Sequence, residues 1–305
     1  MKNIIKKVPV PLCGVMLGMA ALGNLLQSYS EGLRYACGAV AGLLLILVLL
    51  KLILFPKMIA EDMKNPIMAS VAATFPMALM LLSAYVKPFI GQAAYFIWLF
   101  ALALHAVLIV YFTLKFIVKL ELPRVFASYF IVYVGIAAGA ITAPAYESQG
   151  LGTVLVWFAL ASLAVLLVLV TLRYVKSPVP EAARPLICIY AAPTSLCIAG
   201  YIQSVGNKSQ GLLVVLLVVA TALYLFGLVK AVGYLKLPFY PSYAAFTFPF
   251  VITAIATKQT MACLANMGNP QPWLGTVVLV ETVIATAFTL YTLVRFVQFI
   301  FVKKD

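Results

Sequence analysis

Long apolar runs alternate with short polar connections along the whole chain. A helix needs about 20 mostly apolar residues to cross the hydrocarbon core of a bilayer. Runs of that length, each ended by charge, Pro or Gly, predict ten helices, at about residues 9–29, 34–55, 66–86, 92–118, 125–146, 150–174, 184–204, 211–233, 241–262 and 273–301. We therefore expect an all-α membrane protein with a single transmembrane domain over 1–305.

The predicted helices repeat in pairs. The tripeptide Thr-Phe-Pro at 74–76, in the third helix, recurs at 247–249 in the ninth. Each odd helix carries a helix-breaking residue at a corresponding place, and these follow one another at steps of 62, 59, 58 and 56: Gly14, Pro76, Gly135, Pro193 and Pro249. A nearly constant period marks a repeat architecture. It predicts five helical hairpins with quasi-fivefold symmetry, over about 9–55, 66–118, 125–174, 184–233 and 241–301.

The odd and even helices differ in character. Even helices such as 211–233 are smooth runs of Leu and Val, typical of a lipid-facing helix, whereas the odd ones contain the breakers and small or hydroxyl residues. A proline within a span leaves the carbonyl four residues earlier without its helical partner. Such a break is tolerated only where protein or a water-filled cavity satisfies the carbonyl. We therefore expect an inner ring of five kinked odd helices around a central pore, with the even helices outside.

Composition and charge agree with a lipid environment and predict an orientation. Of the 305 residues 65% are hydrophobic and only 10% are charged. Seventeen of the 21 basic residues fall at the two termini or near the connections that follow even helices, and the other four are Arg34, Lys87, Lys208 and Lys258. Because basic loops stay in the cytoplasm, both termini of this multi-pass protein are expected to be cytoplasmic, with the chain in the inner or plasma membrane. The basic residues form no stripe interleaved with exposed aromatics, which argues against a nucleic-acid partner.

Groups for catalysis or metal binding are scarce. The five cysteines are scattered without a C-x-x-C pair, and we interpret them as small buried hydrophobes. His105 is the only histidine, on the fourth helix, where a core position is the simplest interpretation. The odd helices contain no Asp or Glu, so no carboxylate pair is available for acid–base work. We therefore expect no metal, no cofactor and no enzymatic activity.

The same absence of acids bears on ion selectivity. Acidic rings favour cations in pores, and a basic mouth concentrates anions. The positive-inside rule alone explains the basic loops, but it does not explain odd helices without carboxylates. The sequence therefore favours anions as the permeant ions.

Hydroxyl groups near the breakers either donate to a passing anion or bond back to their own backbone. They belong to Thr74, Thr142, Thr194, Ser195 and Thr247.

Two charged residues lie within predicted helices. Glu281, on the tenth helix, is the only acid deep in an apolar stretch. An intramembrane ionisable group is a functional hypothesis by default; on an outer helix, a polar pairing at a helix or subunit interface competes with a role in transport. Lys258 lies near the outer end of the ninth helix, where a long basic side chain reaches the interface.

Several short motifs make the chain resemble the tellurite-resistance/dicarboxylate transporter family, which includes TehA-like bacterial proteins and the slow anion channel of plant guard cells. The matching stretches are 9–11 (Pro-Val-Pro) with Gly14, 17–22 (Leu-Gly-Met-Ala-Ala-Leu), Ala192-Pro193, 199–201 (Ala-Gly-Tyr) and 245–249 (Ala-Phe-Thr-Phe-Pro). The resemblance covers essentially the whole chain. Long cytoplasmic tails, on which phosphorylation acts in the plant relatives, are not expected from this sequence, so control of that kind is not expected either.

The resemblance implies a fold, an assembly and a gate. Members of the family are rings of five hairpins, assemble as homotrimers with a pore in each subunit, and pass anions. A phenylalanine on the ninth helix occludes the pore, and its counterpart by motif position is Phe248. Phe75 is the repeat-equivalent residue and becomes a second gate candidate, while Gln259 lies nearly in line with Phe248 along the helix.

Three functions remain open at this point. The first is a passive channel for small inorganic or organic anions, occluded by Phe248. The second is a proton-coupled or secondary transporter of C4-dicarboxylates or oxyanions such as malate, sulfite or tellurite; coupling calls for a titratable group in the pathway, and the odd helices offer none. The third, a membrane enzyme or scaffold, requires a catalytic cluster or a soluble domain, and the sequence shows neither.

The charge pattern generates a topology prediction. A tag after Asp305 and a tag inserted in the 56–65 connection should both report the cytoplasm, because both places are flanked by basic loops. A tag near Lys208 should report the opposite side. A cytoplasmic signal from the Lys208 region would break the hairpin scheme.

Overall fold

The computed structural model describes residues 2–302, and every regular element in that stretch is helical. Lys303, Lys304 and Asp305 lie outside the described residues. The elements in chain order, with η1 a π-helical turn and the other η elements 3-10 helices, are α1 (Lys2–Lys7), α2 (Leu12–Leu26), α3 (Glu31–Leu54), α4 (Pro56–Asp62), α5 (Pro66–Ala72), α6 (Thr74–Ile90), α7 (Ala93–Phe112), η1 (Thr113–Ile117), η2 (Leu122–Arg124), α8 (Tyr129–Tyr133), α9 (Ala137–Thr142), η3 (Ala143–Tyr146), α10 (Gln149–Lys176), η4 (Glu181–Ala191), α11 (Ala192–Ser204), α12 (Gln210–Tyr234), η5 (Pro241–Phe246), α13 (Phe248–Asn266) and α14 (Leu274–Phe301).

Eight helical segments in residues 2–302 are long and apolar enough to cross a membrane: Glu31–Leu54, Pro66–Ile90, Ala93–Ile117, Gln149–Lys176, Glu181–Ser204, Gln210–Tyr234, Pro241–Asn266 and Leu274–Phe301. The other two predicted helices are shorter. Helix α2 has 15 residues, and 129–146 is divided among α8, α9 and η3. An all-helical, multi-pass membrane protein is therefore confirmed, with eight rather than ten segments that meet the length and composition of a span.

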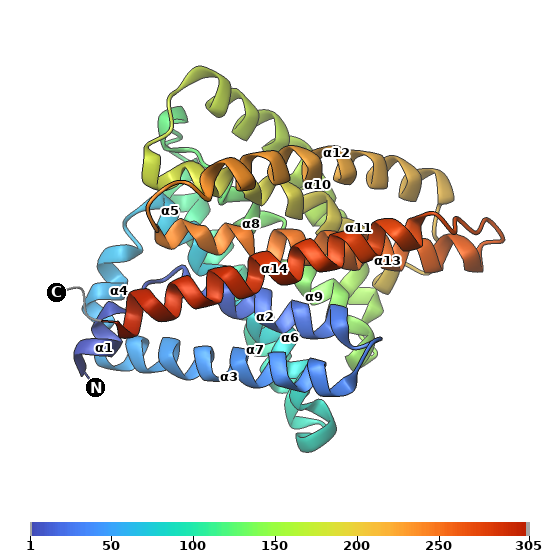
Figure 1. Ribbon diagram of the computed structural model, residues 1–305, viewed down its shortest axis with the longest axis horizontal. Helices are drawn as coiled ribbons and strands as arrows, with labels where there is room; N and C mark the ends of the chain where they lie inside the picture. Colours follow the sequence, from blue (N-terminus) through green and yellow to red (C-terminus); the bar gives the residue numbers. More distant parts are fainter. Residues whose placement is uncertain (1, 303–305) are drawn as a thin grey trace.

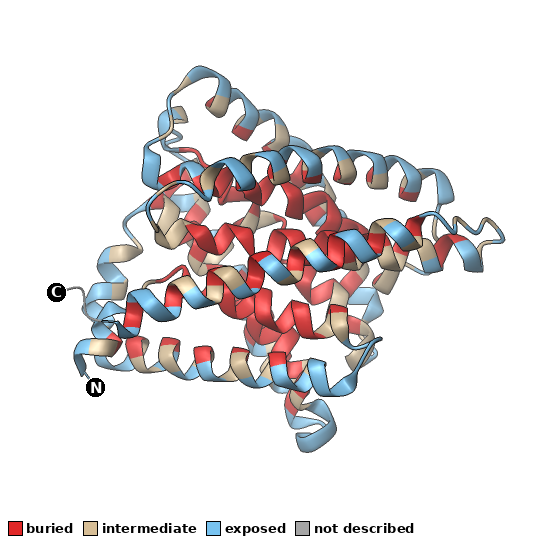
Figure 2. Ribbon diagram, in the orientation of Figure 1, coloured by how far each residue is buried: buried red, intermediate tan, exposed pale blue. Residues whose placement is uncertain are grey.

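Two kinds of segment differ in burial (Figure 2). In η4–α11, 94% of the most apolar 18-residue window is buried inside the protein, compared with 22% in α12. Nearly every residue of α2 is buried. The most buried stretches are the predicted odd helices, and we call them the inner segments: α2, α5–α6, α8–α9–η3, η4–α11 and η5–α13. The exposed faces of α3, α7, α10 and α12 are rich in Leu, Val and Phe, so they suit contact with lipid.

Four of the inner segments are interrupted close to the predicted breakers. Helix α5 ends at Ala72, four residues before Pro76, and η4 gives way to α11 just before Pro193. In η5–α13 the backbone turns at Thr247, whose φ of −100° and ψ of −94° are not helical, two residues before Pro249. Gly135 lies in the turn between α8 and α9. Gly14, by contrast, lies in the first turn of α2, which begins directly after Pro9–Pro11.

The inner segments are joined side by side through hydrogen bonds. Each segment bonds to the next inner segment along the chain, and the last bonds to the first. The donor and acceptor residues are 58 to 65 positions apart in four of these bonds and 233 apart in the fifth. The five bonds run from Tyr85 Oη to the Ala20 carbonyl, Ser70 Oγ to Ser128 Oγ, Ser204 Oγ to the Ala140 carbonyl, Thr253 Oγ1 to the Ala191 carbonyl, and Thr247 Oγ1 to the Gly14 carbonyl.

Both ends of the described chain lie at the same end of the helix bundle (Figure 1). The N-terminal helix α1 packs against α3 and α14 there. A buried lysine secures this contact, because Lys51 Nζ donates a hydrogen bond of 2.5 Å to the Lys6 carbonyl near the end of α1. We refer to this as the terminal end of the bundle and to the other as the far end.

Helices α2 and α13 approach each other closely at a glycine. A Cβ atom at Gly18 would lie 2.5 Å from Thr247 Cβ and 3.0 Å from the backbone nitrogen of Phe248. Real Cβ atoms do not come that close, so any side chain at Gly18 pushes α13 away from α2. Beside this contact, Thr247 Oγ1 donates to the carbonyls of Gly14, at 3.1 Å, and Ala244, at 2.7 Å.

This contact predicts a stability effect. Gly18→Ala should lower the free energy of unfolding by about 1–3 kcal/mol, the usual cost of overpacking, and this would be measured as a lower thermal unfolding temperature in detergent. Gly42→Ala on α3 is the matched control, because a Cβ there meets nothing within 4 Å. Equal unfolding temperatures for the two variants would show that α2 and α13 do not pack as described.

Candidate permeation pathway

The inner segments enclose a cavity of about 270 Å³. All five contribute to its wall, through Gly14 of α2, Thr74 of α6, Gly135 between α8 and α9, Pro193 of α11 and Phe248 of α13. Four of the five predicted breakers are in the wall: Gly14, Gly135, Pro193 and Pro249. The fifth, Pro76 on α6, does not line the cavity. The cavity exists because interrupted backbone and residues without long side chains leave space where regular helices would pack closely.

The cavity extends from the terminal end into the protein. Its outer part is formed by the loop before η4 and the start of η5, including Pro180, Ala182 and Ser242. Along the inner segments its wall reaches no further than Leu17, Met77, Leu196 and Pro249. The space therefore stops partway along the bundle, at a level where apolar side chains meet.

Phe248 lies at the inner limit of this space. It is buried, with 7% of its surface exposed, and it is the first residue of α13. The preceding residue, Thr247, donates a hydrogen bond to the Gly14 carbonyl of α2, so the backbone that carries the ring is tied to α2. Phe75, the other gate candidate, is half-buried and does not line the cavity. The repeat relation thus does not extend to the positions of the two rings.

The predicted hydroxyls mostly bond to backbone. Thr74 lines the cavity, but its Oγ1 donates to the Val71 carbonyl at 2.7 Å. Ser195 donates to the Ala191 carbonyl at 3.1 Å, and Thr142 donates to the Ala138 carbonyl at 2.9 Å while accepting from Trp98.

Two polar groups from the predicted set keep unpaired atoms and lie away from the cavity. They are the hydroxyl of Thr194, which is fully buried, and Oε1 of Gln259 on α13. Thr74 is therefore the one member of the predicted polar set in the cavity wall, and its hydroxyl proton is already engaged with backbone.

Few polar groups face the cavity. Among the described residues of its wall there is no Asp, Glu, Lys, Arg or His. The mouth is polar instead: Tyr240 Oη donates to Glu181 Oε1 at 2.7 Å, and Ser242 Oγ donates to the Ala182 carbonyl at 2.6 Å. The hydrogen bond to Glu181 raises the pKa of Tyr240, while the nearby Arg184 acts in the opposite direction. These two bonds fasten the start of η5 to the start of η4.

Sequence reasoning missed the link between Glu181 and Tyr240. Glu181 precedes the predicted helix 184–204, so its sequence position does not indicate a site residue. The one available signal was the repeat itself, because Glu181 and Tyr240 are 59 positions apart, which is one hairpin period.

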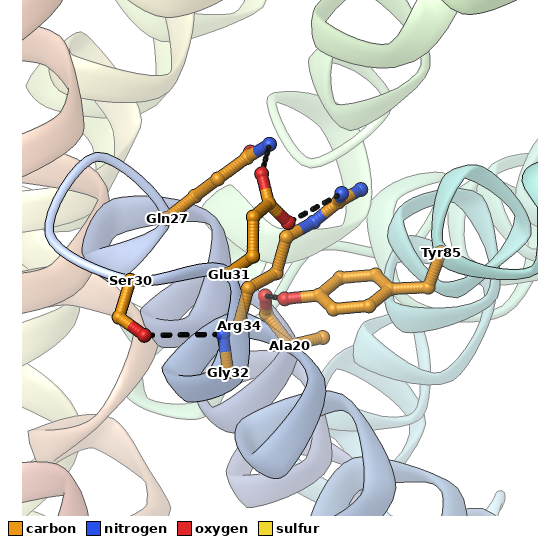
Figure 3. Close-up of polar contacts among 7 residues, drawn as sticks. All are labelled: Ala20, Gln27, Ser30, Glu31, Gly32, Arg34 and Tyr85. Carbon is orange, nitrogen blue, oxygen red and sulfur yellow. Dashed lines mark hydrogen bonds and ion pairs between the residues drawn. The ribbon is translucent and has the colours of Figure 1, made fainter.

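The far end carries basic residues that form an ion pair or hydrogen bonds with nearby groups. Figure 3 shows Arg34 between Glu31, 3.6 Å away in an ion pair, and the ring of Tyr85. Lys258 on α13 donates to the carbonyl of Leu25, at 3.3 Å, and to Ser28. Leu25 belongs to the last turn of α2, where the helix dipole favours a cation. Lys258 therefore clamps α13 to the end of α2.

These features define a class of protein. The chain is a multi-pass helical membrane protein whose most buried, interrupted segments surround an apolar cavity, and it has no metal-binding cluster among the described residues. That is the construction of a channel or transporter.

The comparison with known families is specific. Residues 7–297 match the SLAC1 family, described as voltage-dependent anion channel, and the chain belongs to this family. The resemblance drawn from the sequence motifs is thereby confirmed, and with it a general function as an anion channel or transporter. No curated protein matches the chain.

The cavity geometry predicts a pattern of chemical access. Ala245→Cys, in the cavity wall, should react with an anionic thiol reagent applied from the terminal end. Thr194→Cys is the matched control, because residue 194 is fully buried and off the cavity, and wild type sets the background since its five cysteines are buried. Labelling of Thr194→Cys at the rate of Ala245→Cys would contradict the described cavity.

Proposed function

We propose that this protein conducts small anions through a pore within each subunit, along the axis of the inner segments, and that Phe248 occludes the pore. One observation carries the proposal: all five inner segments line a single cavity that is free of carboxylates and stops at Phe248. A large apolar ring at a constriction excludes water, and an ion cannot pass where water does not.

The proposal includes the architecture of the pore. It treats α2 and 129–146 as spans, which makes ten helices in five hairpins, with the inner segments forming a ring of quasi-fivefold symmetry. The hydrogen bonds between neighbouring inner segments support this, because a spacing of 58 to 65 residues corresponds to one hairpin. The bond between Thr247 and Gly14 spans 233 residues, or four hairpins, as the closing contact of a five-membered ring would.

The chemistry of the wall favours small, weakly hydrated anions. An apolar wall replaces few of the hydrogen bonds that an ion loses with its water, so a strongly hydrated dianion pays a larger desolvation cost than a monovalent one. No carboxylate lies in the described cavity wall to repel the anion, and at the mouth the opposite charges of Glu181 and Arg184 offset each other. This argues for small inorganic anions over C4-dicarboxylates, sulfite or tellurite, and for a channel over a proton-coupled transporter.

Location and assembly complete the proposal. Both ends of the described chain lie at one end of the bundle (Figure 1), and the basic connections would place that end in the cytoplasm of a cell bounded by the inner or plasma membrane. Assembly as a homotrimer with three separate pores rests on the resemblance to the family alone.

The test is removal of the ring. Phe248→Ala in purified protein reconstituted into planar bilayers should raise the anion conductance on the order of tenfold, equivalent to a barrier lower by about 1.4 kcal/mol. Selectivity for anions should be kept, because the charges around the pore do not change.

Phe75→Ala is the matched control, since it removes the same ring from the equivalent motif outside the cavity, and its conductance should stay at the wild-type level. If Phe248 were ordinary packing, Phe248→Ala would be less stable by about 3–5 kcal/mol with no gain in current. Wild-type currents from a folded Phe248→Ala protein would remove the ring from the mechanism.

A further inference from the structure

Glu281 lies between α14 and α13, buried in the protein. Only 3% of its surface is exposed, although its helix is otherwise among the less buried ones. The two helices run antiparallel, and the rings of Phe250 on α13 and Phe288 on α14 stack with centroids 5.0 Å apart. Seven residues further along each helix, in opposite directions, Thr257 comes to lie beside Glu281.

The surroundings of this carboxyl are polar but incompletely paired. Oε2 of Glu281 has no hydrogen-bond partner among the described residues, and neither does the hydroxyl of Tyr224, which reaches the same region from α12. Thr260, one turn beyond Thr257, also has a fully buried hydroxyl without a partner. Several buried groups able to donate or accept a hydrogen bond thus gather behind α13, which is unusual in a well-packed interior.

No basic side chain balances the carboxyl. On α13 the nearest is Lys258, whose amine is bonded to the Leu25 carbonyl in the last turn of α2 and to Ser28 in the α2–α3 connection. On α12 it is Lys230, which lies over the ring of Phe226 towards the terminal end. Arg295, which lies more than three turns from Glu281 along α14, is bonded to Tyr291. Helix α2, which also contacts α14, has Cys13 as its one titratable group, near the terminal end.

The position of this group relative to the gate is specific. Thr257 follows Phe248 by nine residues, which at 100° per residue places the two side chains on opposite faces of α13. Glu281 therefore does not face the cavity, and it is not among the residues that line it. It contacts the back of the helix whose first residue is Phe248.

We propose that Glu281, with Thr257 and Tyr224, forms a proton-binding site behind α13 that controls whether α13 stays packed against α14. This inference rests on the proposed function, since it concerns how the pore is regulated. The neutral carboxyl both donates and accepts hydrogen bonds and fits the packed arrangement. The ionised carboxylate, without a counter-charge in a medium of low dielectric constant, draws water between the helices and loosens α13.

The direction of the effect follows from the structure. The packed arrangement, with Phe248 at the end of the cavity, is the one that the neutral carboxyl stabilises. Loss of the proton as pH rises frees α13 and with it the ring, so the anion current increases with pH. Glu281 lies seven residues from the start of α14 at the far end, and the pH on that side of the membrane is therefore the one that counts.

The experiment uses the full-length protein in planar bilayers, with pH varied separately on the two sides at a fixed anion gradient. Wild type should pass several-fold more current at alkaline than at acidic pH on the far side, with the slope of a one-proton titration. Glu281→Gln, which mimics the neutral form, should hold the low current at every pH, and Glu281→Asp should restore titration with a shifted midpoint. Glu147→Gln, which removes an exposed carboxyl outside the helices, should behave as wild type.

A second measurement does not depend on conduction. Infrared difference spectra recorded across pH should show the carbonyl band of a protonated carboxyl in wild type and lose it in Glu281→Gln, with intact folding checked by thermal unfolding. A wild-type pH response retained in Glu281→Gln, or the absence of a titrating band from Glu281, overturns the proton site. If no variant passes anions at all while the band titrates, the proposed function fails and the proton site stands.

Discussion

The structure depends on one constraint: a backbone group that loses its helical hydrogen bond inside a membrane has to find another partner in the protein. Pro76, Pro193 and Pro249 each interrupt a helix, and lipid offers nothing to the carbonyls they leave free. Only a segment surrounded by other segments tolerates such a break. The interrupted helices are accordingly the most buried ones, and the smooth helices α3, α7, α10 and α12 form the surface.

The same constraint produces the space that the proposed pore uses. Interrupted helices cannot pack along their whole length, so the positions around the breaks open into a cavity with an apolar wall. Side-chain hydroxyls near the breaks bond to backbone carbonyls, Thr74 to Val71 and Thr247 to Ala244 and Gly14. Hydroxyls engaged in this way maintain the walls and are not free to bind an anion. In the proposed pore, selectivity therefore depends on the absence of carboxylates from the described cavity wall.

The far end and the terminal end differ in how they hold charge. At the far end Arg34 is paired with Glu31, whereas Lys258 donates hydrogen bonds to uncharged groups, the Leu25 carbonyl and the Ser28 hydroxyl. At the terminal end the Glu181 carboxylate accepts a hydrogen bond from Tyr240 and lies near Arg184, so opposite charges adjoin each other at the mouth. Some of these contacts also tie segments together: Lys258 joins α13 to α2, and the bond between Tyr240 and Glu181 joins the start of η5 to the start of η4.

The sequence predicted the features that follow from periodicity. Apolar length located the helices, and the steps between Gly14 and Pro249 identified the segments that line the cavity. It did not predict features that depend on side-chain direction: whether Thr74 bonds to backbone, that Phe75 lies outside the cavity whereas Phe248 lies within its wall, or that Lys258 clamps α2. The sequence places Glu281 on the last helix, but its inward direction depends on the register between α13 and α14, which no local pattern encodes. Helix α2 also starts later than predicted. It begins at Leu12 rather than at residue 9, because the chain turns at Pro9–Pro11 first.

The most direct test of the account is the reversal potential of the purified protein in a planar bilayer under a potassium chloride gradient. The account predicts reversal near the equilibrium potential of chloride, and a shift that follows the anion when gluconate replaces chloride on one side. Reversal near the equilibrium potential of potassium, or a membrane that stays silent even with Phe248 replaced by Ala, would contradict it.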